Sequence, residues 1–366
     1  SGWRGMDVPS IQVERFASAD LADEIRQIWL EGVENPEVRI FLLGLIGGGG
    51  ITSSAADVYD LLNSTNSSAS DKIIALRTLA VLNDKRLCEV SAHIAAGDSY
   101  GSKRFVSRAV AVLFPQFMSA DQLCKTLRGI EFKENTVWEG SRYITQIITS
   151  SELDYYVLVE LRDSFVALLS EGLRWQHEWP HITSDFPQYC GILASICLQG
   201  LKQEVNESWC QASVLALCLF NRHFFGINES IQNLREYLFG LSATDNCSLF
   251  WCADTFIQSI HFNSDFFRRF FAVSGNFSLV SLKFDRDYEW IKNALADKNR
   301  SVDDRAMLLE AILHITPVHD IVGERLNRIE HLVEDNPLLL KIFKSRVKIQ
   351  IKYKKSFLRL SRKEKK

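Results

Sequence analysis

The segment "HEWPH", residues 177–181, has the H-E-x-x-H spacing of a zinc-protease motif. On a helix this spacing places two histidines one turn apart as metal ligands, and the glutamate activates a water molecule. Pro180 stands in the fourth position, and a proline inside a helix costs ~3 kcal/mol. We therefore expect His177 and His181 to lie in an exposed loop, with no catalytic or metal-ligating role. A metal hydrolase on a helical scaffold is the alternative.

A run of four glycines, Gly47–Gly50, invites comparison with a phosphate-binding loop. A Walker A loop reads G-x-x-x-x-G-K-[ST] and follows a strand, whereas this run has no lysine beside it and follows a helical pattern. We expect a glycine in left-handed conformation to close that helix, and a hydroxyl to cap the next one. The candidate caps are Thr52, Ser53 and Ser54. Weak anion binding at a helix start is the alternative.

Carboxylates gather in "FDRDYEW", residues 284–290, which holds Asp285, Asp287 and Glu289. Such a cluster could bind a cation. Carboxylates also stabilise the first turn of a helix, because the helix dipole is positive there. We expect the second arrangement, with a helix beginning at this segment.

Aromatic and basic residues alternate in "FFRRFFAVSGNF", residues 266–277, where Arg268 and Arg269 stand between phenylalanines. Proteins that bind single-stranded nucleic acid use such combinations to stack bases. The acidic character of the surrounding chain argues against that use. We expect the phenylalanines to pack in the core.

Eight cysteines are spread along the chain without a C-x-x-C pair. Several stand in apolar helical patterns, and a free cysteine behaves as a small hydrophobic residue. We expect reduced core thiols and no disulfide framework, which is typical of short secreted chains. They are Cys88, Cys124, Cys190, Cys197, Cys210, Cys218, Cys247 and Cys252.

Charge is distributed unevenly between the body of the chain and its last residues. Residues 341–366 carry twelve Lys or Arg and one Glu, a net +11, whereas the rest carries 30 basic and 44 acidic side chains, a net −14. The tail is a candidate patch for nucleic acid or an acidic partner; a solvated terminal helix is the equal alternative. Its candidate residues are Lys348, Lys352, Lys354, Lys355, Arg359 and Arg362.

Helical periodicity dominates the chain of 366 residues, whose composition is 46% hydrophobic and 24% charged, as in ordinary globular proteins. In "DKIIALRTLAVL", Ile73, Leu76, Leu79 and Ala80 share one helical face. Similar patterns predict further helices, and the segment 336–360 predicts a long one. Those helices are expected at 19–31, 119–128, 152–173, 186–203, 206–221, 229–240, 244–261, 286–297, 301–314 and 321–333.

Weak internal repeats accompany these helices. "ALRTLAVL" (75–82) aligns without gaps with "VSRAVAVL" (106–113), and "GSRYITQI" (140–147) continues the series, so that Arg77, Arg108 and Arg142 correspond. "EVRIFLLGL" (37–45) precedes the series, with Arg39 placed 38 residues before Arg77. The resulting offsets of 31–38 residues suit stacked helical hairpins. We therefore predict an all-α fold, an α-solenoid of HEAT- or TPR-like helical hairpins, in two helical subregions.

The predicted divisions follow composition. "RWQHEWPHITSDFPQ" interrupts the helical patterns with two prolines, and it separates two arrays. No apolar run reaches the ~18 residues of a membrane span, and the first residues lack the pattern of a signal peptide, so we expect a cytoplasmic protein. The absence of an initiator methionine suggests a tag remnant or a piece of a longer protein. The predicted parts are 1–173, a helical-repeat array; 174–188, a connecting loop; 189–335, a second array; and 336–366, a basic helical tail.

Several phrases together resemble a known family. "NPEVRIFLLGLI", "LFPQFMSADQL", "FWCADTFIQSI" and "DRDYEWIKNALADKNRSVDDRAMLLEAIL" are similar to the helical-repeat region that follows the P-loop NTPase module in bacterial STAND (NACHT-like) ATPases, including antiphage defence proteins. The likeness spans about 20–315. It implies a sensor or scaffold region on which a ligand such as a viral protein docks. The family's Walker A lysine, Walker B strand and effector have no counterpart here.

These observations predict a non-enzymatic helical-repeat module for protein recognition, without a cofactor. Its expected partners are a protein ligand or a covalently linked NTPase module, with no membrane. A nucleic-acid adaptor acting through the basic tail is a further alternative to the metal hydrolase.

Overall fold

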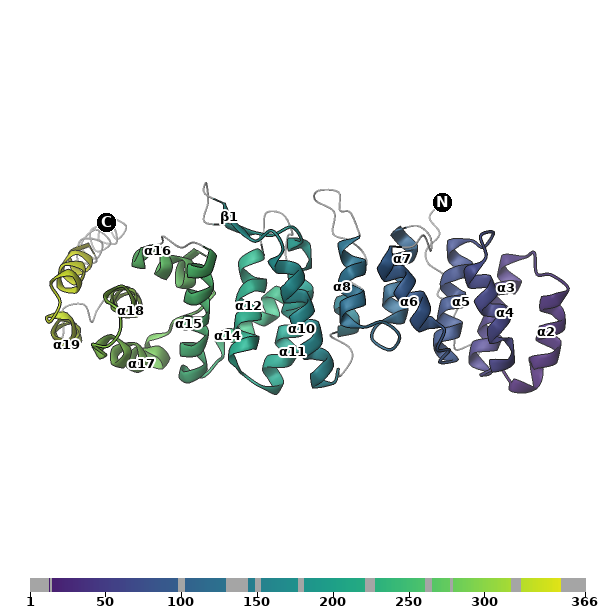
Figure 1. Ribbon diagram of the computed structural model, residues 1–366. Coiled ribbons are helices and arrows are strands. Elements are labelled where there is room, and N and C mark those ends of the chain that lie inside the picture. The colour runs from purple at the N-terminus through teal and green to yellow at the C-terminus, as the bar shows by residue number, and fades with distance from the viewer. Residues whose placement is uncertain are drawn as a thin grey trace, which may run out of the picture. The chain divides into compact units, whose positions relative to one another are not determined.

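The computed structural model describes residue 13 and residues 15–97, 103–129, 144–148, 153–176, 181–220, 228–260, 265–276, 279–316 and 324–349. These residues are almost all helical, and their only strands form one short hairpin, so the prediction of an all-α fold is confirmed (Figure 1). The chain divides into two compact units, Ser1–Leu153 and Asp154–Lys366.

The first unit is a row of short helices. They are η1 (Ala19–Leu21), α2 (Ala22–Leu30), α3 (Pro36–Gly48), η2 (Thr52–Ser54), α4 (Ala55–Asn63), α5 (Ala69–Val81), α6 (Leu87–Ala96), α7 (Lys103–Leu113) and α8 (Ala120–Arg128), with helical backbone also at 144–148. Helix α3 packs on α5, α5 on α7, and α6 on α8, so each helix lies beside its near neighbours in the chain. Their buried face carries the apolar residues that the periodicity selected, among them Leu76 and Leu79, which are fully buried.

The glycine run ends helix α3, as the sequence predicts. Gly50 has a φ of +63°, which suits glycine, and the N–H of Ile51 donates to the carbonyl of Ile46 over 3.0 Å. The predicted hydroxyl cap is wrong. Ser54 precedes α4 but makes no side-chain capping bond, since its Oγ is buried behind the 3₁₀ turn η2 without a hydrogen-bond partner.

The second unit contains longer helices and the hairpin. Its elements are α10 (Tyr155–Ser170), β1 (Arg174–Gln176), β2 (His181–Thr183), η3 (Pro187–Tyr189), α11 (Cys190–Gln203), α12 (Glu207–Leu219), α14 (Glu229–Phe239), α15 (Ala243–Ile260), α16 (Phe266–Phe270), a π-helical turn η4 (Phe271–Asn276), α17 (Phe284–Ala296), α18 (Val302–Ile315), α19 (Glu324–Val333) and a further helix over 337–349. Helix α11 packs on α10, α12 and α14, helix α12 packs on α15, and α17 packs on α15, α18 and α19.

Helices α11 and α12 approach closely at Gly200. Trp209 is fully buried, and a Cβ at Gly200 would lie 2.4 Å from its indole ring. Only glycine leaves room for the ring at this place. The Arg162 guanidinium also lies over the Trp209 ring, 4.6 Å from its centroid, so residues of α10 and α11 both approach the indole.

The division between the two units differs from the predicted one. Residues 174–188 were expected to connect two arrays, but the described ones, 174–176 and 181–188, contain β1, β2 and the start of η3 inside the second unit. Helix α10, assigned by sequence to the first array, packs on α11 and α12 because its face Leu158, Leu161 and Phe165 is buried. The paired strands β1 and β2 therefore belong to the second unit, and the compact units divide after Leu153.

A group of side-chain hydrogen bonds between helices joins residues 30 to 36 apart in the sequence. In the first unit Arg39 binds Asp71 and Thr78 binds the carbonyl of Leu43, 32 and 35 residues apart. In the second unit, interhelical bonds such as Arg269–Asp254 and Asn246–Asp287 have separations of 15 and 41 residues, but one group has separations of 30 to 36. Examples are Ser195–Ser230, Tyr237–Leu201, Arg269–Asp304, Arg305–Asp335 and Arg346–Glu310. The spacings of this group are close to the offsets of 31–38 residues between the sequence repeats.

Candidate functional site

A pocket of about 360 Å³ lies between α12 and α15 in the second unit. We call it the α12–α15 pocket. Its walls carry carboxylate, amide, hydroxyl and thiol groups beside one indole. The lining residues are Val205, Asn206, Glu207, Cys210, Gln211, Asp245, Ser248, Trp251, Cys252 and Thr255.

The wall from α12 is set by the start of that helix. Asn206 is the N-cap, and its side chain accepts a hydrogen bond of 3.1 Å from the N–H of Trp209. Glu207 follows at the first helical position, where its negative charge favours the helix dipole. Cys210 and Gln211 come one turn later on the same face, so the helix directs all these groups to the pocket.

The wall from α15 begins with another capping arrangement. The N–H of Asp245 donates to the Ser242 hydroxyl, which in turn donates to the Asp245 carboxylate over 2.7 Å. Ser248, Cys252 and Thr255 then follow at spacings of three and four, which is one face of a helix. Trp251 lies beside this face, and the Arg300 guanidinium stacks 4.7 Å from its ring centroid.

Two thiols lie in the interior of this pocket. Cys210 is 1% exposed and Cys252 is 8% exposed, and a hydrogen bond joins the two sulfurs. That bond lowers the pKa of Cys252 and, together with burial, raises the pKa of Cys210. By contrast, burial raises the pKa of Cys190 and of Cys197 to about 12. Cys252 thus has the greater thiolate character.

The electrostatics of the pocket favour a cation. Glu207 is exposed and Asp245 is half-buried, so both carboxylates reach solvent, and no Lys, Arg or His belongs to the lining. The amide and hydroxyl oxygens of Asn206, Gln211 and Ser248 add hydrogen-bond acceptors. An ammonium or guanidinium group would therefore find acceptors on both walls.

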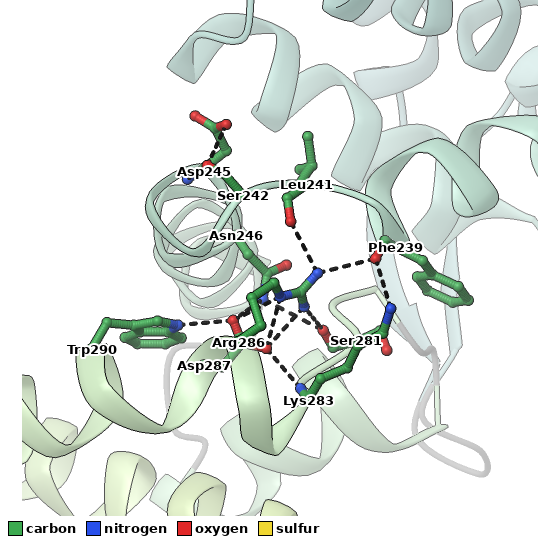
Figure 2. A network of polar contacts seen from close by, with 10 residues as sticks. All are labelled: Phe239, Leu241, Ser242, Asp245, Asn246, Ser281, Lys283, Arg286, Asp287 and Trp290. Atoms are coloured by element: carbon green, nitrogen blue, oxygen red, sulfur yellow. Dashed lines mark hydrogen bonds and ion pairs between the residues drawn. The ribbon is translucent and has the colours of Figure 1, made fainter.

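On its other side, α15 takes part in a closed polar cluster with α17, shown in Figure 2. We call this cluster the Arg286–Asp287 network. Asp287 is fully buried and accepts from the Arg286 guanidinium over 2.8 Å, the Lys283 N–H over 2.7 Å, and the indole of Trp290 over 3.0 Å. The Asn246 amide donates to the same carboxylate over 3.0 Å.

Arg286 ties this carboxylate to the end of α14. Its guanidinium donates to the carbonyls of Phe239 over 3.0 Å, Leu241 over 3.2 Å, and Ser281 (Figure 2). Burial by itself would raise the pKa of Asp287, but the bonds from Arg286 and the other donors outweigh it and hold the pKa below its ordinary value. The Arg286–Asp287 network therefore links α14, α15 and α17 through an ion pair and its hydrogen bonds.

The predicted carboxylate cluster has the structure expected of a helix start. Asp285 and Asp287 lie in the first turn of α17, and Glu289 pairs with Lys292. The three carboxylates do not converge, since Asp287 is buried while Asp285 and Glu289 are exposed. In the described ranges no group of three or more His, Cys, Asp and Glu side chains is placed to hold a metal ion.

The "HEWPH" segment belongs to the hairpin. Gln176 pairs with His181 across the antiparallel strands β1 and β2, so the last histidine of the motif lies in a strand and not on a helix. Residues 177–180, including His177 and Glu178, lie outside the described residues. A zinc-protease motif needs both histidines on one helix. His181, the part of the motif that the structure describes, is in a strand and does not meet this requirement.

The aromatic–basic segment is partly buried. Arg269 is 5% exposed and donates to Asp254 over 2.8 Å and to Asp304 over 2.7 Å. Phe270 is buried as predicted. Phe267 and Phe271 contradict the prediction, since they are 40% and 43% exposed and stack on each other at the surface.

The basic tail is described only at its start. Lys348 is exposed near the end of the helix over 337–349. The other candidate residues lie outside the described residues: Lys352, Lys354, Lys355, Arg359 and Arg362.

All eight cysteines are free, as predicted, although Cys88 is exposed and Cys247 is half-buried.

The α12–α15 pocket was not predicted, because Cys210 and Cys252 stand far apart in the sequence and each follows an ordinary helical pattern. The capping residues Asn206 and Ser242 were the available signal, since they fix where α12 and α15 begin.

Comparison with protein-family models, curated proteins and solved structures finds no match to this chain. Among the helices that the structure describes, none has the length and apolar character needed to cross a membrane. The class of protein that the fold defines is thus an all-α protein built from successive helices.

Proposed function

We propose that this chain is a non-catalytic helical-repeat module that recognises a protein ligand. The observation that carries the proposal is the group of interhelical side-chain bonds, present in both units, whose separations are 30–36 residues, from Arg39–Asp71 to Arg346–Glu310. Repeats that contact only their neighbours form extended surfaces, and such surfaces are typical of proteins that bind other proteins. The α-solenoid arrangement is part of this proposal.

The α12–α15 pocket is the anchoring point in this proposal. Its two carboxylates, Glu207 and Asp245, suit a lysine or arginine side chain of the ligand, and its volume of about 360 Å³ suits one long side chain. Anchors of this kind, placed in a pocket, contribute much of the affinity of protein interfaces. The pocket is built by two helix starts, so its carboxylates are held before a ligand arrives.

The sequence resemblance supports a more specific role, the sensor region of a larger bacterial STAND-type defence NTPase in the cytoplasm. In this role the ligand would be foreign, such as a viral protein, and a linked NTPase would respond to its binding. The reading frame upstream of Ser1 should then encode a P-loop NTPase with a Walker A lysine. Sequencing that region tests the role, and an upstream frame without such a module contradicts it.

Selection from a random peptide library tests the recognition function. The isolated chain should enrich peptides that share one lysine or arginine position, and E207Q/D245N should lose that preference. The matched control is E160Q/E236Q, which removes two exposed carboxylates of the same unit outside the pocket. Equal enrichment by the wild type and E207Q/D245N would contradict the assignment of the pocket.

Calorimetric titration with ATP tests the non-catalytic part of the proposal. The chain alone should give no binding heat and release no phosphate. Stoichiometric ATP binding or turnover by the isolated chain would overturn the proposal.

A further inference from the structure

The paired thiols of the α12–α15 pocket have an arrangement that protein recognition does not require. Cys210 and Cys252 come from different helices, and both line the same open cavity, in which their sulfurs share a hydrogen bond. Helices α12 and α15 pack directly on each other, so the two sulfurs are held together by the fold. Other buried cysteines, such as Cys190 and Cys197, are not part of this cavity.

We propose that Cys210 and Cys252 form a reversible redox site, at which a peroxide that enters the α12–α15 pocket converts the two thiols into a disulfide between α12 and α15. This site shares the pocket with the proposed protein anchor, but its chemistry needs only the two thiols and a peroxide, and no protein ligand. It would respond to small oxidants, because the cavity of about 360 Å³ admits a molecule of that size.

The asymmetry of the pair assigns the two roles. The thiolate is the form of cysteine that attacks a peroxide, and the hydrogen bond from Cys210 lowers the pKa of Cys252. Cys252 is also the more exposed of the two, at 8% against 1%. Cys252 is therefore the attacking residue, and Cys210 is the resolving residue.

The reaction proceeds in two steps. The Cys252 thiolate attacks one oxygen of hydrogen peroxide, the O–O bond breaks, and Cys252 sulfenic acid and hydroxide form. The Cys210 sulfur then attacks the Cys252 sulfur, the S–O bond breaks, and the hydroxyl leaves as water with the Cys210 proton. Two thiols are oxidised to one disulfide while one peroxide is reduced to two waters, and a thiol reductant reverses the reaction.

Treatment of the folded chain with hydrogen peroxide tests the proposal, in a Cys88→Ser background that removes the exposed thiol. The chain should lose the mass of two hydrogen atoms, and peptide mapping should find Cys210 joined to Cys252. Dithiothreitol should restore the original mass. A chain that keeps all its thiols, or that pairs other cysteines, would overturn the proposal.

Single variants separate the two roles and guard against misfolding. In Cys210→Ala the sulfenic acid at Cys252 should persist and be trapped by a 1,3-dione, whereas Cys252→Ala should give neither adduct nor disulfide. Cys247→Ser is the matched control, because Cys247 lies on the same helix but burial raises its pKa; it should leave disulfide formation unchanged. Circular dichroism confirms folding of each variant, and equal trapping in Cys252→Ala would contradict the assigned roles.

Discussion

Helix α15 has polar groups on two sides, and the two sides differ in how those groups are satisfied. Towards α17, the buried carboxylate of Asp287 accepts hydrogen bonds from Arg286, Lys283, Trp290 and Asn246. Towards α12, the carboxylates of Glu207 and Asp245 line an open pocket. A polar cluster whose charges are paired stabilises the fold, whereas carboxylates that face an open pocket can still bind a ligand.

Removal of the Asp287 carboxylate, at the centre of the Arg286–Asp287 network, should have the largest effect on the stability of the fold. Asp287→Ala leaves the guanidinium of Arg286 without its acid and several buried donors without an acceptor. Breaking a buried ion pair in this way costs about 3–5 kcal/mol. Urea unfolding followed by circular dichroism measures the loss. Asp285→Ala, an exposed position in the same turn, should cost less than about 1 kcal/mol, and an equal cost for both would refute the distinction.

A methyl group at Gly200 should disturb the packing beside the pocket. The added Cβ would lie 2.4 Å from the ring of Trp209, which cannot move because it is fully buried. Overpacking of this kind costs about 1–3 kcal/mol. Gly129→Ala is the control, because a Cβ there would lie 3.5 Å from the nearest atom, the Thr126 carbonyl oxygen, which is an ordinary van der Waals contact. Thermal unfolding of both variants should show a lower Tm for Gly200→Ala alone.

Acid should lower the stability of the fold through protonation of Asp287 in the Arg286–Asp287 network. Its native pKa is below the ordinary value of 3.8, so the unfolded chain takes up a proton first as the pH falls. The stability that Asp287 contributes is thus complete above pH 3.8 and is lost as the pH falls through that value towards the native pKa. Urea midpoints measured across this range should fall less steeply for D287N than for the wild type. Parallel curves would show that Asp287 titrates alike in both states.

Removal of one carboxylate from the α12–α15 pocket should have the smallest effect on stability. Glu207 is exposed, lies in the first turn of α12, and accepts a hydrogen bond of 2.9 Å from the Gln211 amide, so Glu207→Gln should cost only about 0.3–1 kcal/mol. The same urea experiment measures it. A cost as large as that of Asp287→Ala would mean that the pocket is a structural cluster.

Local signals in the sequence predict the helices well. The predicted helix at 229–240 is α14 (Glu229–Phe239), because Asn228 caps its start and apolar residues recur at helical spacing. The repeat offsets likewise anticipate the spacing of bonds such as Arg39–Asp71. The predictions that failed concern features that depend on tertiary context. The hairpin at Arg174–Thr183 lacks a two-residue turn signal, and the buried hydroxyl of Ser54 follows from a 3₁₀ turn that its neighbours do not specify.

The candidate site was beyond sequence reasoning for a related reason. Asn246 and Asp287 are 41 residues apart, and only the packing of α15 on α17 brings them together. The pocket similarly depends on which face of α12 meets α15. The sequence predicts that Asp285 and Asp287 begin a helix, but it does not reveal that one is buried and the other exposed.

The most direct test of the pocket is calorimetric titration of one selected arginine-containing peptide into the wild type, E207Q/D245N and E160Q/E236Q. We predict equal affinities for the wild type and the control, lost binding for the pocket variant, and weaker binding at high salt because the contact is ionic. Affinity that survives in E207Q/D245N would contradict the claim that this pocket recognises the ligand.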